Sequence, residues 1–231
     1  MDRGLYIAAS GMLAEQIRQD QIANDLANAS TPGYKGDRTA QATFGDLLLA
    51  NSATGAVVGR QSTAVQVAEI RTDFRPTAAR DTGEPLDFAI TGEGFFSVQT
   101  PQGVRYTRNG QFSLDTNGQL ITAQGHLVLG TGGRPIAAGA DGKVDPRLIG
   151  VTLLTNPRKE GDSLVTGTPA GAAPAGTVRS GALEGSGADP ARSMVDMIAS
   201  MRAFEAGQKV IQAIDETLGQ AVSKVGSVSG G

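Results

Sequence analysis

Few side chains in this chain could carry out catalysis, and their neighbours do not complete a catalytic group. The only histidine is His126. A metal site would need further ligands at coordinating spacing, and a triad would need a nucleophile and a carboxylate; neither pattern is recognisable beside it. Cysteine is absent, which excludes thiolate chemistry and disulfides. We therefore interpret His126 as a structural or surface residue.

Four short motifs resemble functional sites but lack their full spacing. Gly92-Glu93-Gly94 is not followed by the third glycine of a dinucleotide loop or by a long helix. Gly185-Ser186-Gly187 lacks the full spacing of a nucleophile elbow. Asp115-Thr116-Asn117-Gly118 begins like a calcium loop without the later ligands, so a turn explains it better. Asn28-Ala29-Ser30 is a formal glycosylation sequon at a predicted helix end. The sequence thus predicts no enzyme, cofactor, metal or small-molecule site.

The elements that could position side chains are clearer, above all an apolar stripe near the C-terminal end. Its members alternate at spacings of three and four residues: Met194, Met197, Met201, Phe204, Gln208, Ile211, Asp215, Leu218, Val222 and Val225. This spacing is typical of a helix with one narrow apolar seam. A helix from Ala191 to Val225 would be roughly 50 Å long. Gly207 and Gly219 each weaken it by about 1 kcal/mol relative to alanine, so we expect the helix to depend on a partner.

A second stripe with the same spacing opens the chain. It runs through Leu5, Ala9, Met12, Gln16, Gln19, Ala23 and Leu26. Pro32 disfavours helical conformation at Thr31, and Pro32-Gly33 suits the centre of a type II turn, so the helix should end near residue 29. Two stripes with one period, far apart in sequence, most simply bury each other as a coiled coil.

The residues between the stripes show no helical period. Residues 36–85 are predicted to be an extended connection with one possible strand over Ala64–Ile70. From residue 86 the pattern favours short β-strands. Asn109-Gly110 predicts a type I′ hairpin between Arg105–Arg108 and Gln111–Leu114, and Asn117-Gly118 repeats the signal. The Gly/Ala/Pro-rich stretch from Gly167 to Gly187 is predicted to be a loop or linker.

These predictions give an α+β fold, in which N- and C-terminal helices pair as a coiled coil and carry an inserted antiparallel all-β domain. The expected parts are the N-terminal helix and turn over residues 1–35, an extended connection over 36–85, the β-domain over 86–160 and possibly to 185, and the C-terminal helix over 186–231.

Composition excludes several classes of function. The 231 residues carry 20 basic and 23 acidic side chains, a net charge of −3, so there is no electrostatic case for binding nucleic acid. No run of eighteen apolar residues is present, as a membrane-spanning helix would need. The opening residues lack the basic and apolar regions of a cleaved signal peptide, so export by that route is not expected.

Three motifs, in order, resemble the bacterial flagellar rod and hook proteins. Residues 22–35, Ile-Ala-Asn-Asp-Leu-Ala-Asn-Ala-Ser-Thr-Pro-Gly-Tyr-Lys, are similar to the N-terminal signature of that family. Residues 91–96 and 106–112 resemble its central β-domain. Residues 195–198 and 202–205 resemble its C-terminal helix. The motifs bracket nearly the whole chain.

The resemblance implies a structural subunit of the flagellar basal-body rod, a drive shaft that transmits torque, in the cell envelope and on the periplasmic side where an outer membrane is present. It implies copies of the chain, other rod subunits and the flagellar type III export apparatus as partners. Met1-Asp2-Arg3, Lys209-Val210-Ile211 and Asp215-Glu216 look like the proximal rod protein, whereas Gly33-Tyr34-Lys35 and residues 202–205 look as much like the distal one. The proximal rod is our reading, with the distal rod or another hook–basal-body subunit as the alternative.

The predicted assembly residues lie on both helices and on the turn after the first. The packing residues are Leu5, Met12, Leu26, Met197, Met201, Phe204, Ile211 and Leu218, accompanied by the motif residues Asn24 and Asn28. Thr31, Pro32, Gly33 and Tyr34 are expected to set the angle at which the chain leaves the helical part.

Two other classes of function remain open. An envelope-associated hydrolase would need paired carboxylates in a cleft. A soluble β-domain acting as a binding or adhesin module would need neither helix. Neither class explains two matching stripes at the two ends of the chain.

Overall fold

The computed structural model describes residues 2–43, 46–50, 57–62, 65–139, 142–170 and 176–228. Two compact units are present. The first contains residues 1–26, 37–71 and 190–231, and the second contains residues 27–36 and 72–189. The structure therefore assigns residues 27–36 and 72–85 to the β-domain rather than to the helix or the connection, and it extends that domain to residue 189.

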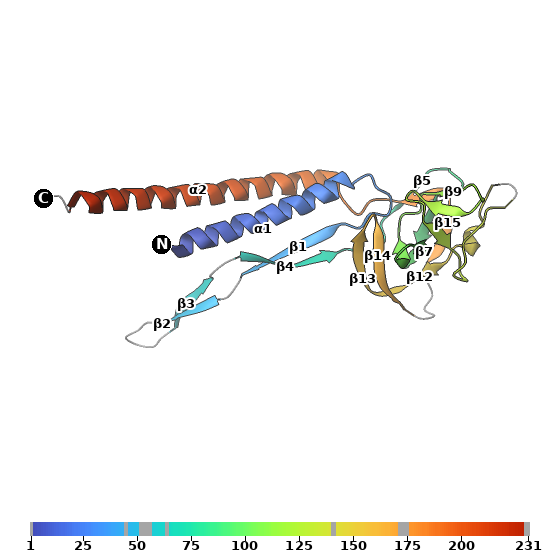
Figure 1. Ribbon diagram of the computed structural model, residues 1–231, viewed down its shortest axis with the longest axis horizontal. Coiled ribbons are helices and arrows are strands. Elements are labelled where there is room, and N and C mark those ends of the chain that lie inside the picture. Colours follow the sequence, from blue (N-terminus) through green and yellow to red (C-terminus); the bar gives the residue numbers. More distant parts are fainter. Residues whose placement is uncertain are drawn as a thin grey trace. The chain divides into compact units, whose positions relative to one another are not determined.

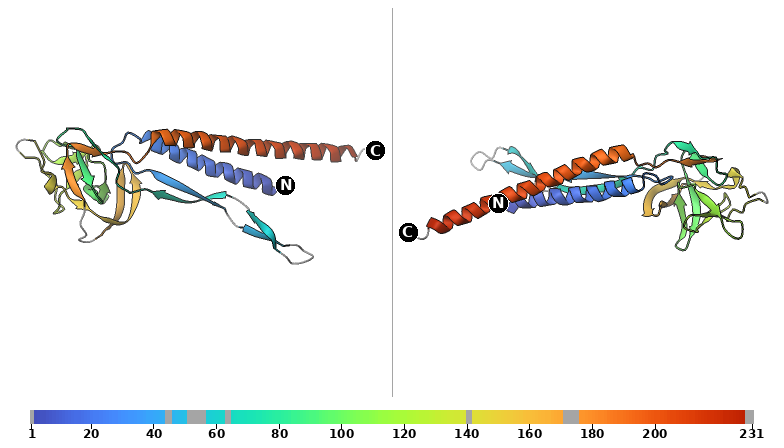
Figure 2. Two further views of the ribbon diagram at one scale, coloured as in Figure 1. Left: turned by 180° about the vertical axis from the view of Figure 1, so that it is seen from behind. Right: turned by 90° about the horizontal axis from the view of Figure 1, so that it is seen from above.

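The first unit is built on two helices, α1 (Asp2–Ala27) and α2 (Pro190–Val228). They run side by side in opposite directions, as the two views of Figure 2 show. The direction is fixed by contacts between Glu15 and Ser200 at one level and by the proximity of Gly4 to Ile214 at another. Both predicted helices are thus present, and α1 ends before the Pro32-Gly33 turn. No helix in the described residues is long and apolar enough to cross a membrane.

The first unit also contains two strand pairs, where an extended connection was expected. β1 (Asp37–Thr43) pairs with β4 (Val65–Thr72), and β2 (Asp46–Ala50) pairs antiparallel with β3 (Val57–Ser62) (Figure 1). The predicted strand at Ala64–Ile70 overlaps β4, although residues 63 and 64, like 51–56 of the expected connection, lie outside the described residues. The partner strands were missed because Asp37–Thr43 has no apolar alternation.

The second unit contains an antiparallel sheet, eight-stranded in the part of the chain that is described. Seven strands lie in the order β13-β14-β8-β7-β11-β10-β9, and β12 also pairs with β7. Their bounds are β7 Phe95–Thr100, β8 Gly103–Thr107, β9 Phe112–Leu114, β10 Leu120–Thr122, β11 Leu127–Leu129, β12 Val151–Thr152, β13 Leu154–Gly161 and β14 Leu164–Pro169. A single 3₁₀ turn, η1 (Pro146–Leu148), precedes β12.

Two smaller strand pairs complete the second unit. β6 (Phe88–Thr91) pairs with β15 (Thr177–Ser180), and β5 (Ala79–Asp81) pairs with β16 (Ala182–Glu184). The prediction of a loop or linker is therefore wrong for residues 167–169, which end β14, and for residues 177–180 and 182–184, while residues 171–175 of that stretch lie outside the described ones. Strands of three and four residues are too short to produce a visible period, and their partners lie between 86 and 105 positions earlier.

The core of the second unit is aromatic and aliphatic. Phe88, Phe96, Leu120 and Val128 are fully buried, and the rings of Phe96 and Phe112 meet edge to face with centroids 5.3 Å apart. A second, smaller cluster contains Phe95, Tyr106 and Val165. Seven phenylalanines, most of them here, supply the bulk that a chain without tryptophan needs.

Of the two predicted hairpin turns, only one is present. β9 and β10 form a hairpin around Gly118, which has φ +73° and donates its N–H to the carbonyl of Asp115 at 3.0 Å. At Asn109-Gly110 the prediction is wrong, because β8 pairs with β7 and β14 and neither turn residue has positive φ. Gly110 is instead required by packing: a Cβ there would lie 1.7 Å from the carbonyl oxygen of Phe88.

Candidate functional site

The face that α2 turns toward α1 agrees with every second residue of the predicted stripe. At the positions between them, the residue that faces α1 is the one just before the predicted residue. Met197, Phe204, Ile211 and Leu218 are partly buried, as the stripe predicts. The intervening positions are filled by Ser200, Gly207 and Ile214. Ser200 is completely buried, whereas Met201 is 49 % exposed. Met201 therefore does not lie on the face that α2 turns toward α1, and its role in packing between subunits stays a prediction.

Small residues explain the shift. The Ser200 hydroxyl donates a hydrogen bond to the Glu15 carboxylate at 2.6 Å. A Cβ on Gly207 would lie 2.7 Å from Cγ of Met12, so the two helices approach closely at this level. A search for a hydrophobic stripe considers only residues with large apolar side chains. It therefore misses helix contacts made by serine and glycine.

The predicted residues of α1 lie partly on the contact face. Met12 and Leu26 are partly buried, whereas Leu5 is 39 % exposed and Asn24 is exposed. The most buried apolar positions of α1 are instead Ala14 and Ile22. Ile22 belongs to the N-terminal motif.

An apolar surface remains on α2 away from α1. Met194, Ile198 and Met201 are 54 %, 54 % and 49 % exposed. Because they are spaced four and three residues apart, they lie on one face of the helix. We call these three residues the α2 patch. About half of each side chain is still open to solvent, so covering it would be worth about 1 kcal/mol per residue, which favours association.

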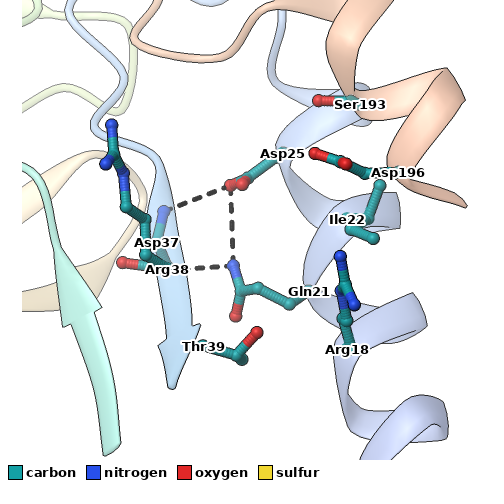
Figure 3. Close-up of a pocket in the computed structure, with 9 residues that line it drawn as sticks. All are labelled: Arg18, Gln21, Ile22, Asp25, Asp37, Arg38, Thr39, Ser193 and Asp196. Carbon is teal, nitrogen blue, oxygen red and sulfur yellow. Dashed lines mark hydrogen bonds between the residues drawn. The ribbon is translucent and has the colours of Figure 1, made fainter. Parts of the chain in front are cut away.

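A polar pocket of about 420 Å³ lies among α1, β1 and the start of α2 (Figure 3). Nε2 of Gln21 donates to Oδ2 of Asp37 at 3.3 Å and reaches Oδ1 of Asp25 at 3.5 Å. The backbone N–H of Asp37 donates to the same Asp25 oxygen at 3.4 Å. Figure 3 also shows Asp196 on the opposite wall. These bonds fix the start of β1 to the end of α1, which is a structural role.

The turn after α1 is anchored in the second unit. The carbonyl of Asn28 accepts hydrogen bonds from the N–H of Thr31 at 3.1 Å and from the Ser186 hydroxyl at 2.9 Å. Gly33 has φ +65°, and a Cβ there would lie 2.3 Å from the backbone carbonyl of Arg108, so glycine is required. Tyr34 is 3 % exposed, and its hydroxyl accepts a hydrogen bond from Lys159 at 2.9 Å.

Beside this turn lies a group of buried charges, which we call the ionic cluster: Lys35, Arg108 and Glu184. Nζ of Lys35 lies 2.6 Å from Oε1 of Glu184, and Nη1 of Arg108 lies 3.0 Å from Oε2. The three side chains are between 1 % and 4 % exposed. The Glu184 carboxylate also accepts the N–H of Thr77 at 2.8 Å. One carboxylate thus joins residues from four distant parts of the chain.

Each cation of the ionic cluster has a further partner. Lys35 donates to the carbonyl of Arg75 at 2.7 Å, and Nη2 of Arg108 donates to the carbonyl of Gly92 at 2.8 Å. The Arg108 guanidinium also stacks over the Phe95 ring, with its carbon 5.3 Å from the centroid. Burial lowers the pKa of Lys35 below its ordinary value, and the attraction of Glu184 opposes that effect without cancelling it.

Apart from the ionic cluster, a notable carboxylate is Asp115, in the turn that resembles a calcium loop. Its Oδ1 accepts the backbone N–H groups of Gln119 at 2.7 Å and Asn117 at 2.8 Å. These hydrogen bonds, that from Gln119 above all, hold the pKa of Asp115 below its ordinary value. Among the described residues no group of three or more possible metal ligands occurs. The geometry is that of a turn, with its carboxylate already bonded to the backbone.

The structure thus gathers Asn28, Thr31, Pro32, Gly33 and Tyr34 at one anchor and distributes the helical residues over two faces. Sequence reasoning missed Ser200, Gly207, Arg108 and Glu184 as positioning residues. A usable signal existed for Glu184, because it follows Ala182-Leu183 directly and ends a short apolar run. Arg108 and Lys35 lie within the quoted motifs, but their sequence does not reveal that they meet.

Known families match three separate parts of the chain. Residues 5–35 match the flagella basal body rod protein family. Residues 89–153 match the D1 domain of the flagellar hook protein FlgE/F/G family, and residues 179–224 match the C-terminal part of the flagellar basal body rod FlgEFG protein family. The first and third matches cover the two helices, and the second covers the core of the β-sheet.

Individual relatives match over nearly their full length. The flagellar basal-body rod protein FlgG of Bacillus subtilis is 33% identical over 96% of this chain and 99% of its own length. FlgF of Mesorhizobium japonicum is 32% identical over 99% of this chain and all of its own. The flagellar hook-basal body complex protein FlhO of Bacillus subtilis is 28% identical over 99% of this chain and all of its own. The resemblance seen in the three sequence motifs is thereby confirmed, and the chain belongs to the flagellar basal-body rod protein family.

Proposed function

We propose that this chain is a structural subunit that polymerises into the flagellar basal-body rod and transmits torque along it. Membership of the rod family places it in the flagellar basal body as a structural protein and not an enzyme. The observation that carries polymerisation is the α2 patch. Three large apolar side chains on one helical face, each about half exposed, are unusual for a chain that stays alone.

The proposed mechanism is repeated burial of helix faces. α1 and α2 pair as an antiparallel coiled coil in which the small residues Ser200 and Gly207 let the helices approach closely. The α2 patch lies on another face and contacts neighbouring subunits. A contact between two different surfaces that does not close into a ring generates an open helical filament. Two observations support the pairing of α1 with α2. The Ser200 hydroxyl bonds to Glu15, and partly buried residues recur at regular intervals along α2. The turn at Thr31–Tyr34 then sets where the chain leaves the helical part.

The proposed partners are copies of this chain, other rod subunits and the flagellar type III export apparatus. Placement within the rod is proximal in our proposal, based on residues 1–3 and 209–211. Relatives named FlgG and FlgF match at 33% and 32% identity, and the distal rod or another hook–basal-body subunit is the alternative. Electron microscopy of basal bodies from a strain lacking the chain separates the two, because the remaining axle would end at different levels.

A substitution in the α2 patch tests polymerisation directly. Met201→Asp places a charge on a half-exposed face, so the free energy of unfolding of the isolated chain should fall by only about 1 kcal/mol. Burial of that unpaired charge between subunits should block assembly and swimming. Ala206→Asp is the matched control, since Ala206 is exposed on another face of the same helix. Normal swimming of the Met201→Asp strain would overturn the proposal.

A further inference from the structure

α2 is longer than its partner helix. The proximity of Gly4 to Ile214 places the first turn of α1 level with residues 214–218 of α2. α2 nevertheless continues to Val228, and Figure 1 shows this end extending past the start of α1. Residues 219–228, which we call the overhang, are about 15 Å long at the rise of an α-helix.

The overhang continues the face of α2 that packs on α1. Ile211 and Leu218 on that face are partly buried. Val222 follows at the same spacing but is 72 % exposed, the largest exposed fraction among the large apolar residues of α2 whose burial is described. Val225 maintains the spacing in the sequence. Val222 thus presents an apolar side chain beyond the start of α1, the helix that packs on this face elsewhere.

An apolar groove of about 450 Å³ lies along the helix pair at a different level. Its lining includes Gly4, Ala8, Gly11, Met12, Gly207 and Val210. From Gly4 to Glu15, the lining residues of α1 span about 16 Å. Gly11 has open space where a Cβ would be, so another helix can approach the backbone closely.

We propose that the overhang of one copy of this chain packs into the groove of a second copy. The two surfaces match in length, about 15 and 16 Å, and the apolar groove suits the exposed apolar side chain of Val222. A chain cannot fill its own groove, because Val222 lies fifteen positions after Gly207 on the same straight helix, about 22 Å away. The contact joins two different surfaces, so each copy offers one groove and one overhang and the interaction propagates. This inference rests on the proposed polymerisation and names its interface.

The absence of cysteine makes the interface testable by disulfide trapping in the full chain. Ala8→Cys and Val222→Cys are introduced into two separate copies, co-expressed in a strain lacking the native gene. Basal bodies are isolated, oxidised mildly and separated without reductant. A disulfide needs Cα atoms within about 7 Å, so we expect about tenfold more reducible dimer than with Ala9→Cys, the exposed neighbour of Ala8 on another face.

The outcomes separate the interface from the function. Equal dimer yields for Ala8→Cys and Ala9→Cys in swimming cells would overturn the interface and leave the rod function intact. Normal swimming without the gene would overturn the function itself. If the Val222→Cys chain is not incorporated into basal bodies, the incorporation of Gln220→Cys, on the opposite side of the overhang, is measured instead. Incorporation of Gln220→Cys alone supports the interface, and failure of both overturns it.

Discussion

The ionic cluster allows one prediction to be worked out in detail, for the substitution Glu184→Gln. The amide keeps the size of the side chain but removes the charge that both Lys35 and Arg108 face at 2.6 and 3.0 Å. Removing one partner from a buried ionic group typically destabilises a protein by about 3–5 kcal/mol, because the other charges are left without compensation. One amide oxygen can still accept the N–H of Thr77. We therefore expect the lower end, about 3 kcal/mol.

Urea unfolding measures this loss. Two of the three tyrosines, Tyr34 and Tyr106, are buried in the second unit, so tyrosine fluorescence reports on that unit in a chain without tryptophan. With a slope of about 2 kcal/mol per molar urea, the midpoint should fall by about 1.5 M. Glu160→Gln is the matched control: Glu160 pairs with Arg105 but is 45 % exposed, so its loss should stay within about 1 kcal/mol.

Equal midpoints for the two variants would refute the reasoning, since they would show that burial does not strengthen the dependence of Lys35 and Arg108 on Glu184. If Glu184→Gln does not fold at all, Thr77→Val provides a smaller step. It removes the hydroxyl that donates to the carbonyl of Gly185 at 2.7 Å and contacts Glu184 at 3.1 Å. The expected loss is about 1 kcal/mol.

Three further predictions concern backbone, charge and helix contact. Gly33→Ala should destabilise the second unit by more than about 2 kcal/mol in urea unfolding, because strain and a backbone clash add, whereas Gly118→Ala, with φ +73° and open space, should lose only about 1 kcal/mol. The folded state lowers the pKa of Lys35, so the unfolded chain binds more protons than the folded chain just below pH 10.5. The free energy of unfolding, measured by urea unfolding, should therefore rise with pH in that range more steeply than it does in the Lys35→Met variant. Parallel pH profiles of the two proteins would contradict this. Gly207→Leu should separate α1 from α2 and abolish swimming, whereas Gly219→Ala, with open space around it, should raise helix content by circular dichroism and preserve swimming; the reverse pattern would count against the close approach.

The sequence predicted the elements whose pattern is long and regular. Both helices and most strands between Phe88 and Leu129 carry enough periodic residues to identify their type. The end of α1 could also be placed, because Pro32 and Gly33 restrict the backbone locally. Family membership followed from motifs at both ends of the chain.

What the sequence did not reveal depends on contacts between distant residues. The contact face of α2 uses Ser200 and Gly207, whose small size matters only once α1 lies against them. The Asn109-Gly110 dipeptide has the composition of a hairpin turn, yet tertiary packing against Phe88 gives it another conformation. Glu184 joins Lys35 and Arg108 across separations of 149 and 76 positions, and a single sequence carries no record of such pairings.

The chain segments that enter and leave the second unit are bonded directly to each other. The N–H of Gly33 donates to the carbonyl of Glu184 at 2.9 Å, and the N–H of Gly187 donates to the carbonyl of Tyr34 at 2.8 Å. A force that pulls these two segments apart must break this short ladder and the adjoining charges before any tension reaches the β-sheet. The hydrogen bonds between these two segments therefore shield the sheet from mechanical load. The loops of the sheet can vary in length without changing how force passes through the chain.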